Sequence, residues 1–267
     1  LHVRSRRQRQ MCIRDSFGIV MAVSQYFEFV SKTVYEESVS HLTEVFHQSD
    51  NMLGELTHKN LMYLHMWSEY LQDAPSESKI RDYIDKAQKD AGFLYFYFLS
   101  ADGNYKMTTG ETGYLGLQEN IEDEIQKGND IITNAAVPGK SQMLVFASPK
   151  AHGSYQGFQY DAIAIAYENA DIVNVLDISA FNGKAKSYVL HPDGRVVIDH
   201  SLESWGNVYN FFGILREHTD ISEKEILKIS KKFKEGHTGA MLLNLDGQDY
   251  YLVYEKSDIQ DWVFLGL

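Results

Sequence analysis

The sequence predicts an α+β protein in which one long N-terminal helix is followed by two tandem modules, each an antiparallel sheet with flanking helices. Three observations predict this fold class. A helical pattern without proline and with one glycine covers residues 31–73. Asp-Gly turn signals lie between apolar runs at 102 and again at 193. The order strand, turn, strand, helical middle, strand, turn, strand then occurs twice along the chain.

The composition is that of a globular protein with an acidic excess. The 267 residues carry 25 Lys and Arg against 37 Asp and Glu, a net charge of −12. Because proteins bind nucleic acid through clustered Lys and Arg, this balance disfavours a nucleic-acid partner. The single cysteine, Cys12, lies close to the N-terminus. The rest of the chain therefore has no disulfide framework, no thiol nucleophile and no cysteine-based zinc site.

Residues 1–16 differ in composition from the rest, with five of the basic residues and one acidic residue. The segment RRQRQMCIRDS resembles the translated sequencing-adapter peptide found at the ends of fragmentary metagenomic gene products. We therefore expect residues 1–16 to be an artefact and leave them out of the fold reasoning. By its charge alone, the segment reads as a basic cytoplasmic stub before a membrane helix, or as a basic arm.

The apolar run FGIVMAV (17–23) leads through SQYFEFV into a long polar helix pattern. Seven apolar residues are too few to span a bilayer, which needs about 20. The run is typical of the outer end of a transmembrane helix whose first part is missing. We expect residues 17–30 to be the remnant of such a helix with its outer flank. The alternative is the buried start of a soluble helix.

A stalk helix is expected over residues 31–74. Apolar residues recur there at steps of three and four: Val34, Leu42, Val45, Met52, Leu56, Tyr63, Trp67 and Leu71. A helix of this length reaches roughly 60 Å and needs a partner along its length. The partner is either the domain beside it or a second copy, and we expect a homodimer through the stalk. Pro75 ends the pattern, and Ser76 or Ser78 is expected to cap the next helix.

The first module is expected over residues 75–180. FLYFYFLS reads as a covered strand, followed by Asp102-Gly103, a pair typical of a type I′ hairpin turn with positive φ at both residues. A short acidic helix around 121–127 comes next. The strands SQMLVFAS and FQYDAIAIAYE follow, with a turn near Tyr155 between them, and NADIVNVLDIS is expected to form a helix leaving the module.

The second module is expected over residues 181–267. Its strands are KSYVLH and RVVIDHS around Asp193-Gly194, AMLLNL and QDYYLVYE around Asp246-Gly247, and a last strand, DWVFLGL. A helical middle separates the two hairpins. The later turn lies 53 positions after the first in both modules, from 102 to 155 and from 193 to 246. This spacing favours two copies of one layout.

This series of elements resembles the double Cache sensor domain, two PAS-like folds in series on a stalk helix. The resemblance covers about residues 17–267 and is carried by YFYFLSADGNYKMTTG, SYVLHPDGRVVIDHS and GHTGAMLLNLDGQDYYLVYEKSDIQDWVFLGL. It implies the extracellular sensing domain of a bacterial membrane receptor, held by flanking transmembrane helices. The output module, a sensor histidine kinase or a diguanylate cyclase, would lie outside this chain. No cofactor and no metal are expected.

The resemblance also implies a small-molecule site in the first, membrane-distal module, between its sheet and the loops that cover it. The ligand-binding residues expected here are Tyr95, Tyr97, Ser148, Tyr160, Asp161, Tyr167 and Asp177. Aromatic walls with carboxylates suit a cationic or amine-bearing molecule. The alternative is that the tyrosines pack in the core and Asp161 faces solvent. Strand alternation places Asp161 and Tyr167 on one face and Tyr160 on the other unless a bulge intervenes.

Two absences in the sequence limit the function. The amino-acid-binding branch of the family carries an Arg-x-Trp element whose Arg clamps the ligand carboxylate, and this chain has no Arg-x-Trp. It also has no HExxH, GxSxG, Walker A or GxGxxG motif, so we expect no catalytic residues and no enzymatic activity. The alternatives are a secreted or membrane-anchored enzyme or binding protein, and a ligand-free dimerisation scaffold.

Overall fold

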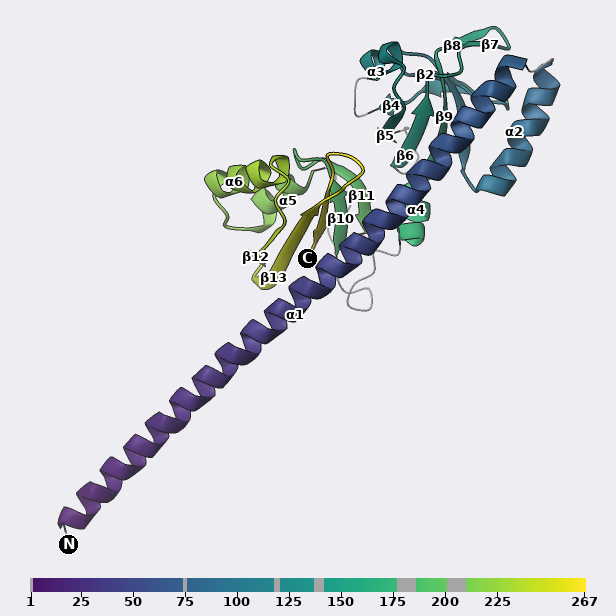
Figure 1. Cartoon of the computed structure of the whole chain (residues 1–267). Coiled ribbons are helices and arrows are strands. Elements are labelled where there is room, and N and C mark those ends of the chain that lie inside the picture. Colours follow the sequence, from purple (N-terminus) through teal and green to yellow (C-terminus); the bar gives the residue numbers. More distant parts are fainter. Residues whose placement is uncertain (1, 74–75, 118–120, 137–141, 177–185, 201–209) are drawn as a thin grey trace.

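The computed structural model describes residues 2–73, 76–117, 121–136, 142–176, 186–200 and 210–267, which form one long helix with two sheets placed along it (Figure 1). Helix α1 (His2–Asp73) is continuous over 72 residues, a length of about 110 Å. The expected stalk is thus the second part of a longer helix. Within the described residues, none of the helices has a stretch both long enough and apolar enough to cross a membrane.

Helix α2 (Glu77–Ala91) turns back and runs beside the distal end of α1 (Figure 1). The rings of Tyr70 on α1 and Tyr83 on α2 stack with centroids 3.9 Å apart. Ser76 occupies the N-cap position of α2, but its hydroxyl contacts that of Ser78 at 3.2 Å and makes no capping hydrogen bond. Gly92 ends α2 with a φ of 78°, and the chain then enters the first sheet.

The distal sheet has seven strands in the order β3-β2-β1-β9-β6-β5-β4. Its strands are β1 (Tyr95–Leu99), β2 (Asn104–Lys106), β3 (Thr112–Tyr114), β4 (Gly116–Leu117), β5 (Ile131–Ala136), β6 (Met143–Ser148) and β9 (Ala162–Glu168). The hairpin of β7 (Gly153–Tyr155) and β8 (Phe158–Tyr160) is inserted between β6 and β9, and α3 (Glu122–Lys127) between β4 and β5. Helix α4 (Asn169–Leu176) follows β9.

The second sheet, called proximal because it lies nearer the N-terminus of α1, has five strands in the order β11-β10-β14-β13-β12 (Figure 1). They are β10 (Ser187–Leu190), β11 (Val196–His200), β12 (Gly239–Leu245), β13 (Gln248–Lys256) and β14 (Val263–Gly266), with α5 (Phe211–His218) and α6 (Glu223–Lys234) between β11 and β12. The five central strands of the distal sheet, β2-β1-β9-β6-β5, have the same antiparallel order. The fold class predicted from the sequence, two tandem modules on a stalk helix, is therefore confirmed.

The two opening turns are alike but differ from the predicted type. Asp102 and Asp193 do not have positive φ; Gly103 (86°) and Gly194 (87°) do. The Gly103 amide donates to the Ser100 carbonyl at 2.9 Å, and the Gly194 amide makes the same bond to His191 at 2.8 Å. These are type I turns closed by a left-handed glycine. The type I′ prediction holds for the third pair, where Asp246 (52°) and Gly247 (82°) both have positive φ.

The equal spacing of 53 positions does not reflect equivalent turns. The turn near Tyr155 closes the inserted β7–β8 hairpin, whereas the turn at Asp246 joins β12 to β13. The structural counterpart of β12 is β5, a strand that the sequence analysis did not predict. The repeated order of elements is correct. The strand of the distal module that corresponds to β12 is β5, and not the strand before the turn near Tyr155.

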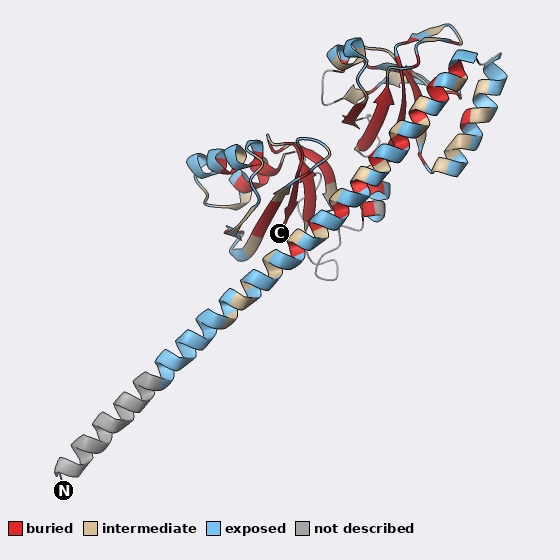
Figure 2. Ribbon diagram, viewed as in Figure 1, coloured by how far each residue is buried: buried red, intermediate tan, exposed pale blue. Residues whose placement is uncertain are grey.

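Helix α1 covers the same face of both sheets (Figures 1 and 2). Phe46 and Trp67 of α1 are at most 2% exposed and share one apolar core with strands of both modules. Burying one such side chain contributes about 1.5–3 kcal/mol. The opposite faces hold separate cores, under α5 and α6 in the proximal module and beside α3 in the distal one. Helix α1 therefore contacts both sheets and joins the two modules.

Candidate functional site

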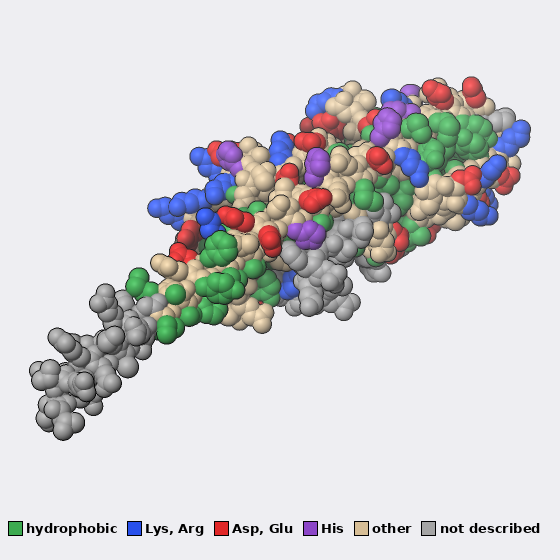
Figure 3. Space-filling model, turned by 60° about the horizontal axis from the view of Figure 1, so that its bottom comes forward, with side chains coloured by type: hydrophobic (Ala, Val, Ile, Leu, Met, Phe, Trp, Pro, Cys, Tyr) green, Lys and Arg blue, Asp and Glu red, His purple; other side chains and the backbone are tan. Residues whose placement is uncertain are grey.

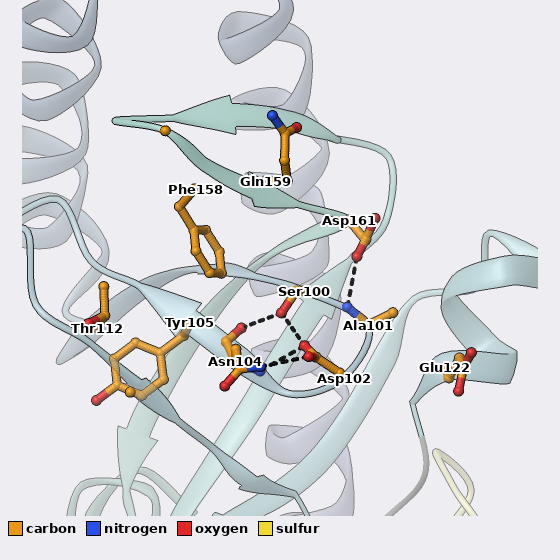
Figure 4. Close-up of a pocket in the computed structure, with 12 residues that line it drawn as sticks. Ser100, Ala101, Asp102, Asn104, Tyr105, Thr112, Glu122, Phe158, Gln159 and Asp161 are labelled. Carbon is orange, nitrogen blue, oxygen red and sulfur yellow. Dashed lines mark hydrogen bonds between the residues drawn. The ribbon is translucent and has the colours of Figure 1, made fainter.

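A cleft of about 720 Å³ lies at one end of the distal sheet, within the range of small-molecule sites (Figure 4). It is bounded by the β1–β2 turn, by β3, by the start of α3 and by the β7–β8 hairpin. Six of its lining residues carry the argument below: Ser100, Asp102, Tyr105, Glu122, Phe158 and Asp161. Elements distant in the sequence thus meet at one hollow of the surface.

The β1–β2 turn fixes the first carboxylate of the cleft. Asp102 accepts hydrogen bonds from the Ser100 hydroxyl at 2.5 Å and from the Asn104 side-chain amide at 2.6 Å. The hydrogen bond from Ser100, followed by that from the Asn104 backbone, lowers the pKa of the Asp102 carboxyl. Asp102 is therefore anionic and held in one orientation at neutral pH.

Two further carboxylates face the same cleft. Asp161 lies between β8 and β9, and its Oδ2 accepts a hydrogen bond from the Ala101 amide at 2.8 Å, which ties it to the β1–β2 turn (Figure 4). Glu122 faces the cleft from the first turn of α3. Among the described residues that line the cleft there is no Lys or Arg. The three carboxylates are not arranged as a metal site, since no such group of ligands occurs among the described residues.

A row of aromatic side chains on the distal sheet reaches the cleft through Tyr105. Tyr97 packs edge-on against Tyr105 at 4.7 Å and stacks on Tyr95 at 5.9 Å. Tyr97 is fully buried, and burial raises the pKa of its hydroxyl well above its usual range. Tyr105 belongs both to this aromatic row and to the cleft lining. The cleft therefore lies at the end of the sheet, between Tyr105 from the core on the face away from α1 and Phe158, which packs against the core shared with α1.

Three of the predicted ligand residues lie on the other face of the sheet. Tyr167 donates a hydrogen bond to Oδ1 of Asn60 on α1 at 2.8 Å, and burial raises its pKa to about 12. The Tyr160 ring packs on Phe98 at 4.9 Å, within the core shared with the stalk. Ser148 is fully buried, and its hydroxyl has no partner among the described residues.

The seven predicted residues are therefore not brought together. Asp161 lines the cleft. Tyr95 and Tyr97 lie on the sheet face away from α1, beside Tyr105 of the cleft. Ser148, Tyr160 and Tyr167 lie on the face that packs on α1, and Asp177 lies outside the described residues. The expected placement of Tyr160 opposite Tyr167 is wrong. The chain bends at Asp161 between β8 and β9, and this bend returns the Tyr160 side chain to the face of Tyr167.

The sequence analysis missed most of the cleft. Asp102 was recognised as a turn residue but not as a site residue, and Tyr105, Glu122 and Phe158 were not selected. The available signal was the polar run around the first Asp-Gly pair, SADGN, whose short side chains hydrogen-bond to one another. The contributions of α3 and β8 follow only from the tertiary fold.

The chain was compared with known protein families, curated protein sequences and solved structures. No family model and no curated protein sequence matches the chain. Among solved structures, the ligand-binding domain of the Pseudomonas aeruginosa amino acid chemoreceptor PctB, in complex with L-Arg, has a TM-score of 0.58 and 14% identity. That match covers 86% of this chain and 94% of the other.

Two further structures agree with it. The ligand-binding domain of the Pseudomonas aeruginosa chemoreceptor PctC, in complex with GABA, matches with a TM-score of 0.57 and 13% identity over 85% of this chain and 97% of its own. The extracellular domain assigned to the histidine kinase mmHK1S-Z3 matches with 0.56 and 12% over 89% and 93%. At these identities the likeness is one of fold. It confirms the fold predicted from the sequence, two tandem modules on a long helix.

Proposed function

We propose that this chain is the extracellular small-molecule sensing domain of a bacterial membrane signalling receptor and has no catalytic activity itself. The observation that carries the proposal is the acid-lined cleft at one end of the distal module of a double Cache fold. Neighbours with this fold are ligand-binding domains of chemoreceptors and the extracellular domain of a histidine kinase. The output module would be a histidine kinase or a diguanylate cyclase.

The ligand that the cleft fits best carries an amine and no carboxylate. Asp102, Glu122 and Asp161 supply negative charge, and the aromatic rings of Tyr105 and Phe158 suit the alkyl part or the face of a cation. A ligand carboxylate would meet these acids without a lining Arg or Lys to balance it. PctB and PctC are seen with L-Arg and GABA, which bear a cationic group and also a carboxylate; for this chain we propose the cationic group alone. The missing Arg-x-Trp element is consistent with a different amine.

The part of α1 that precedes the stalk supports membrane attachment and contact with a covering partner. Large apolar side chains there are exposed, among them Ile19 (64%), Tyr26 (66%) and Phe29 (68%). Figure 3 shows hydrophobic side chains gathered over this part of the helix. Such a surface calls for a covering partner. We assign residues 17–30 to the membrane-proximal flank of a transmembrane helix and the stalk above it to a homodimer contact.

Signalling would pass from the cleft to the stalk. Ligand binding favours the cleft geometry that contacts it best, and β1 and β9 link the cleft to the face that packs on α1. The Tyr167–Asn60 bond joins that face to the stalk directly. A small axial or rotational shift of α1 against its twin would then cross the membrane.

A thermal-shift screen tests the proposal. The whole chain is heated with amines that lack a carboxylate (putrescine, agmatine), with amino acids (GABA, L-Arg) and with carboxylates that lack an amine (acetate, succinate). We expect at least one amine to raise the melting temperature by several degrees and the carboxylates to have no effect. Asp161→Asn keeps an oxygen for the Ala101 amide but removes the charge, and should abolish the amine shift.

The matched control is Asp85→Asn, which removes an exposed carboxylate on α2 and should leave the amine response intact. Stabilisation by carboxylates alone, or an amine shift that survives Asp161→Asn together with Glu122→Gln, contradicts the proposal. A chain that responds to none of the compounds favours the ligand-free scaffold.

A further inference from the structure

The edge strand β12 of the proximal sheet is unlike the other strands at sheet edges. An edge exposes unpaired backbone groups, and proteins limit such edges by shortening, covering or charging them. The distal edges β3 and β4 have three and two residues. Strand β12 has seven residues, GAMLLNL, with no charge, no proline and a regular ladder to β13. None of the usual protective devices is present in its sequence.

The opposite edge of the same sheet, β11, is covered by the distal module. Side-chain amides of Gln142, Asn134 and Asn169 donate to the carbonyls of Val196, Val197 and Asp199 at 3.0, 2.7 and 2.7 Å. Among the described residues, no equivalent group reaches β12. The contrast within one sheet shows which edge the fold closes.

The turn that joins β12 to β13 fixes which backbone groups point outward. The two-residue turn Asp246-Gly247 is flanked by the pair Leu245↔Gln248, which is the hydrogen-bonded kind. By alternation, Leu243 and Met241 also bond to β13, while Ala240, Leu242 and Asn244 present N–H and C=O to the open edge. The side chain of Leu242 is 57% exposed. The edge therefore offers both backbone groups and apolar surface.

A groove of about 480 Å³ runs between this edge and α6. Its floor is apolar, formed by Ile221, Ile229, Met241 and Leu243. Side chains of a strand laid beside β12 would point alternately into this groove and towards Leu242. The groove thus supplies a pocket for alternate side chains, which is the requirement for strand addition.

Helix α6, which borders the groove, is rich in Lys, and this favours an acidic binding partner. Helix α6 carries Lys224, Lys228, Lys231, Lys232 and Lys234 in a chain of net charge −12. Lys228 and Lys232 line the groove together with Glu225 and Asp220. Hydrogen bonds from Ser222 and, after them, the charge of Lys228 lower the pKa of the Glu225 carboxyl. The Glu225 carboxylate is engaged by Ser222 in a capping box. Asp220 lies at the end of the groove near the α5–α6 connection.

A second copy fits this edge poorly. Two β12 strands paired about a twofold axis would place both α6 helices on one face, next to each other. Lys228 and Lys232 of the two copies would then approach across the junction, and like charges there oppose pairing. An acidic strand from another protein meets no such repulsion.

We propose that β12 and the adjoining α6 groove bind an extended, acidic segment of a partner protein as an additional strand. One side chain of the segment fills the apolar floor, and carboxylates two residues away meet Lys228 and Lys232. The interaction is separate from the ligand cleft and does not depend on its occupancy. It gives the proximal module a binding role of its own.

The test uses the whole chain and two synthetic peptides with a fluorescein label at the N-terminus and an amidated C-terminus, Ser-Glu-Thr-Val-Thr-Glu-Ser and Ser-Lys-Thr-Val-Thr-Lys-Ser, in which the charged residues lie two positions from Val and on the same face. Fluorescence anisotropy should show binding of the acidic peptide and at least tenfold weaker binding of the basic one. Amide exchange at Ala240, Leu242 and Asn244 should slow when the acidic peptide is added. Leu242→Glu, at an exposed position of the edge, should weaken binding of the acidic peptide at least tenfold because it places a like charge beside it.

Lys228→Glu with Lys232→Glu should weaken binding to the same extent. The matched control is Lys86→Glu with Lys89→Glu, which makes the same change of charge on the exposed side of α2. Equal loss in both double variants, or acidic binding without slower exchange in β12, would overturn the proposal. A dimer that dissociates with Leu242→Glu in sedimentation experiments would show that the occupant is a second copy, and would overturn it as well.

Discussion

The carboxyl group of Glu255 on β13 is partly buried, and its surroundings disfavour the ionised form. Its Oε2 is buried without a hydrogen-bond partner among the described residues. Burial raises the pKa of the Glu255 carboxyl. His47 of the stalk lowers this pKa, whereas the nearby carboxylates of Asp50 and Asp258 raise it further. Asp50 is itself held by the Ser257 hydroxyl and the Asp258 amide at 2.5 and 2.9 Å. The stalk and the β13–β14 loop thus share a small acidic junction.

This junction predicts a pH dependence of stability. A raised folded-state pKa contributes stability below the ordinary carboxyl range, and that stability is lost as the pH rises through the folded-state value. Glu255→Gln should therefore raise the melting temperature at pH 7 and change it little at pH 4. Melting curves at both pH values check this, with Asp85→Asn as the exposed control. A variant less stable than the parent at pH 7 would contradict the explanation.

Single residues also mark where sequence reasoning succeeds. Gly103 and Gly194 were predicted as turn glycines, and both have the positive φ that glycine adopts without strain. At Gly194 a Cβ would lie 2.5 Å from Cδ2 of Phe212, so packing also demands glycine there. The turn type was wrong because an Asp-Gly pair fits both a type I′ turn and the last two positions of a three-residue loop. Loop length, set by strand pairing, decides between them.

At the scale of elements, the edge of β11 holds the two modules together. Asn169, at the start of α4, both donates to the Asp199 carbonyl at 2.7 Å and accepts from the Asp199 amide at 3.0 Å. Its side chain pairs with β11 as a neighbouring strand would. The distal module therefore completes the proximal sheet.

Removing this side chain should loosen the junction. Asn169→Ala leaves two backbone groups of Asp199 without their partner and should lower the free energy of unfolding by about 1–3 kcal/mol. Asn169→Asp keeps the acceptor and loses the donor, so its loss should be smaller. Denaturant titration measures both, and amide exchange at Asp199 should quicken in the alanine variant. Parent-like stability and exchange in Asn169→Ala would refute this role.

Elements with strong periodicity were predictable and the short ones were not. The predicted stalk pattern marked the buried side of α1 in part: Leu42 and Trp67 are 2% exposed, but Val34 and Met52 are 50% and 38% exposed. The fully buried Phe46, Leu53 and Leu64 were not in the predicted set. Strands β3 and β4 span three and two residues, too few for alternation to register. In β5, the polar pair Thr133-Asn134 interrupts the apolar run, yet both side chains are buried by tertiary packing.

At the scale of the whole molecule, the sequence predicted two modules on a stalk but not which sheet face meets it. Alternation separates the two faces of each strand, so Phe96 and Phe98 were distinguishable from Tyr95 and Tyr97. It does not say which face α1 covers. In the structure α1 packs against Phe96 and Phe98, and this choice places Tyr167 at the stalk and Tyr97 behind the cleft. The predicted site was therefore divided between two faces.

The central claim, that the distal cleft senses an amine, is tested most directly by hydrogen–deuterium exchange of the whole chain. The exchange is compared without ligand and with the amine that stabilises the chain most. The account predicts slower exchange in the β1–β2 turn, around Asp161 and along the stalk beside the distal sheet, with α5 and α6 unchanged. Protection confined to the proximal module, or none in the β1–β2 turn, would contradict it.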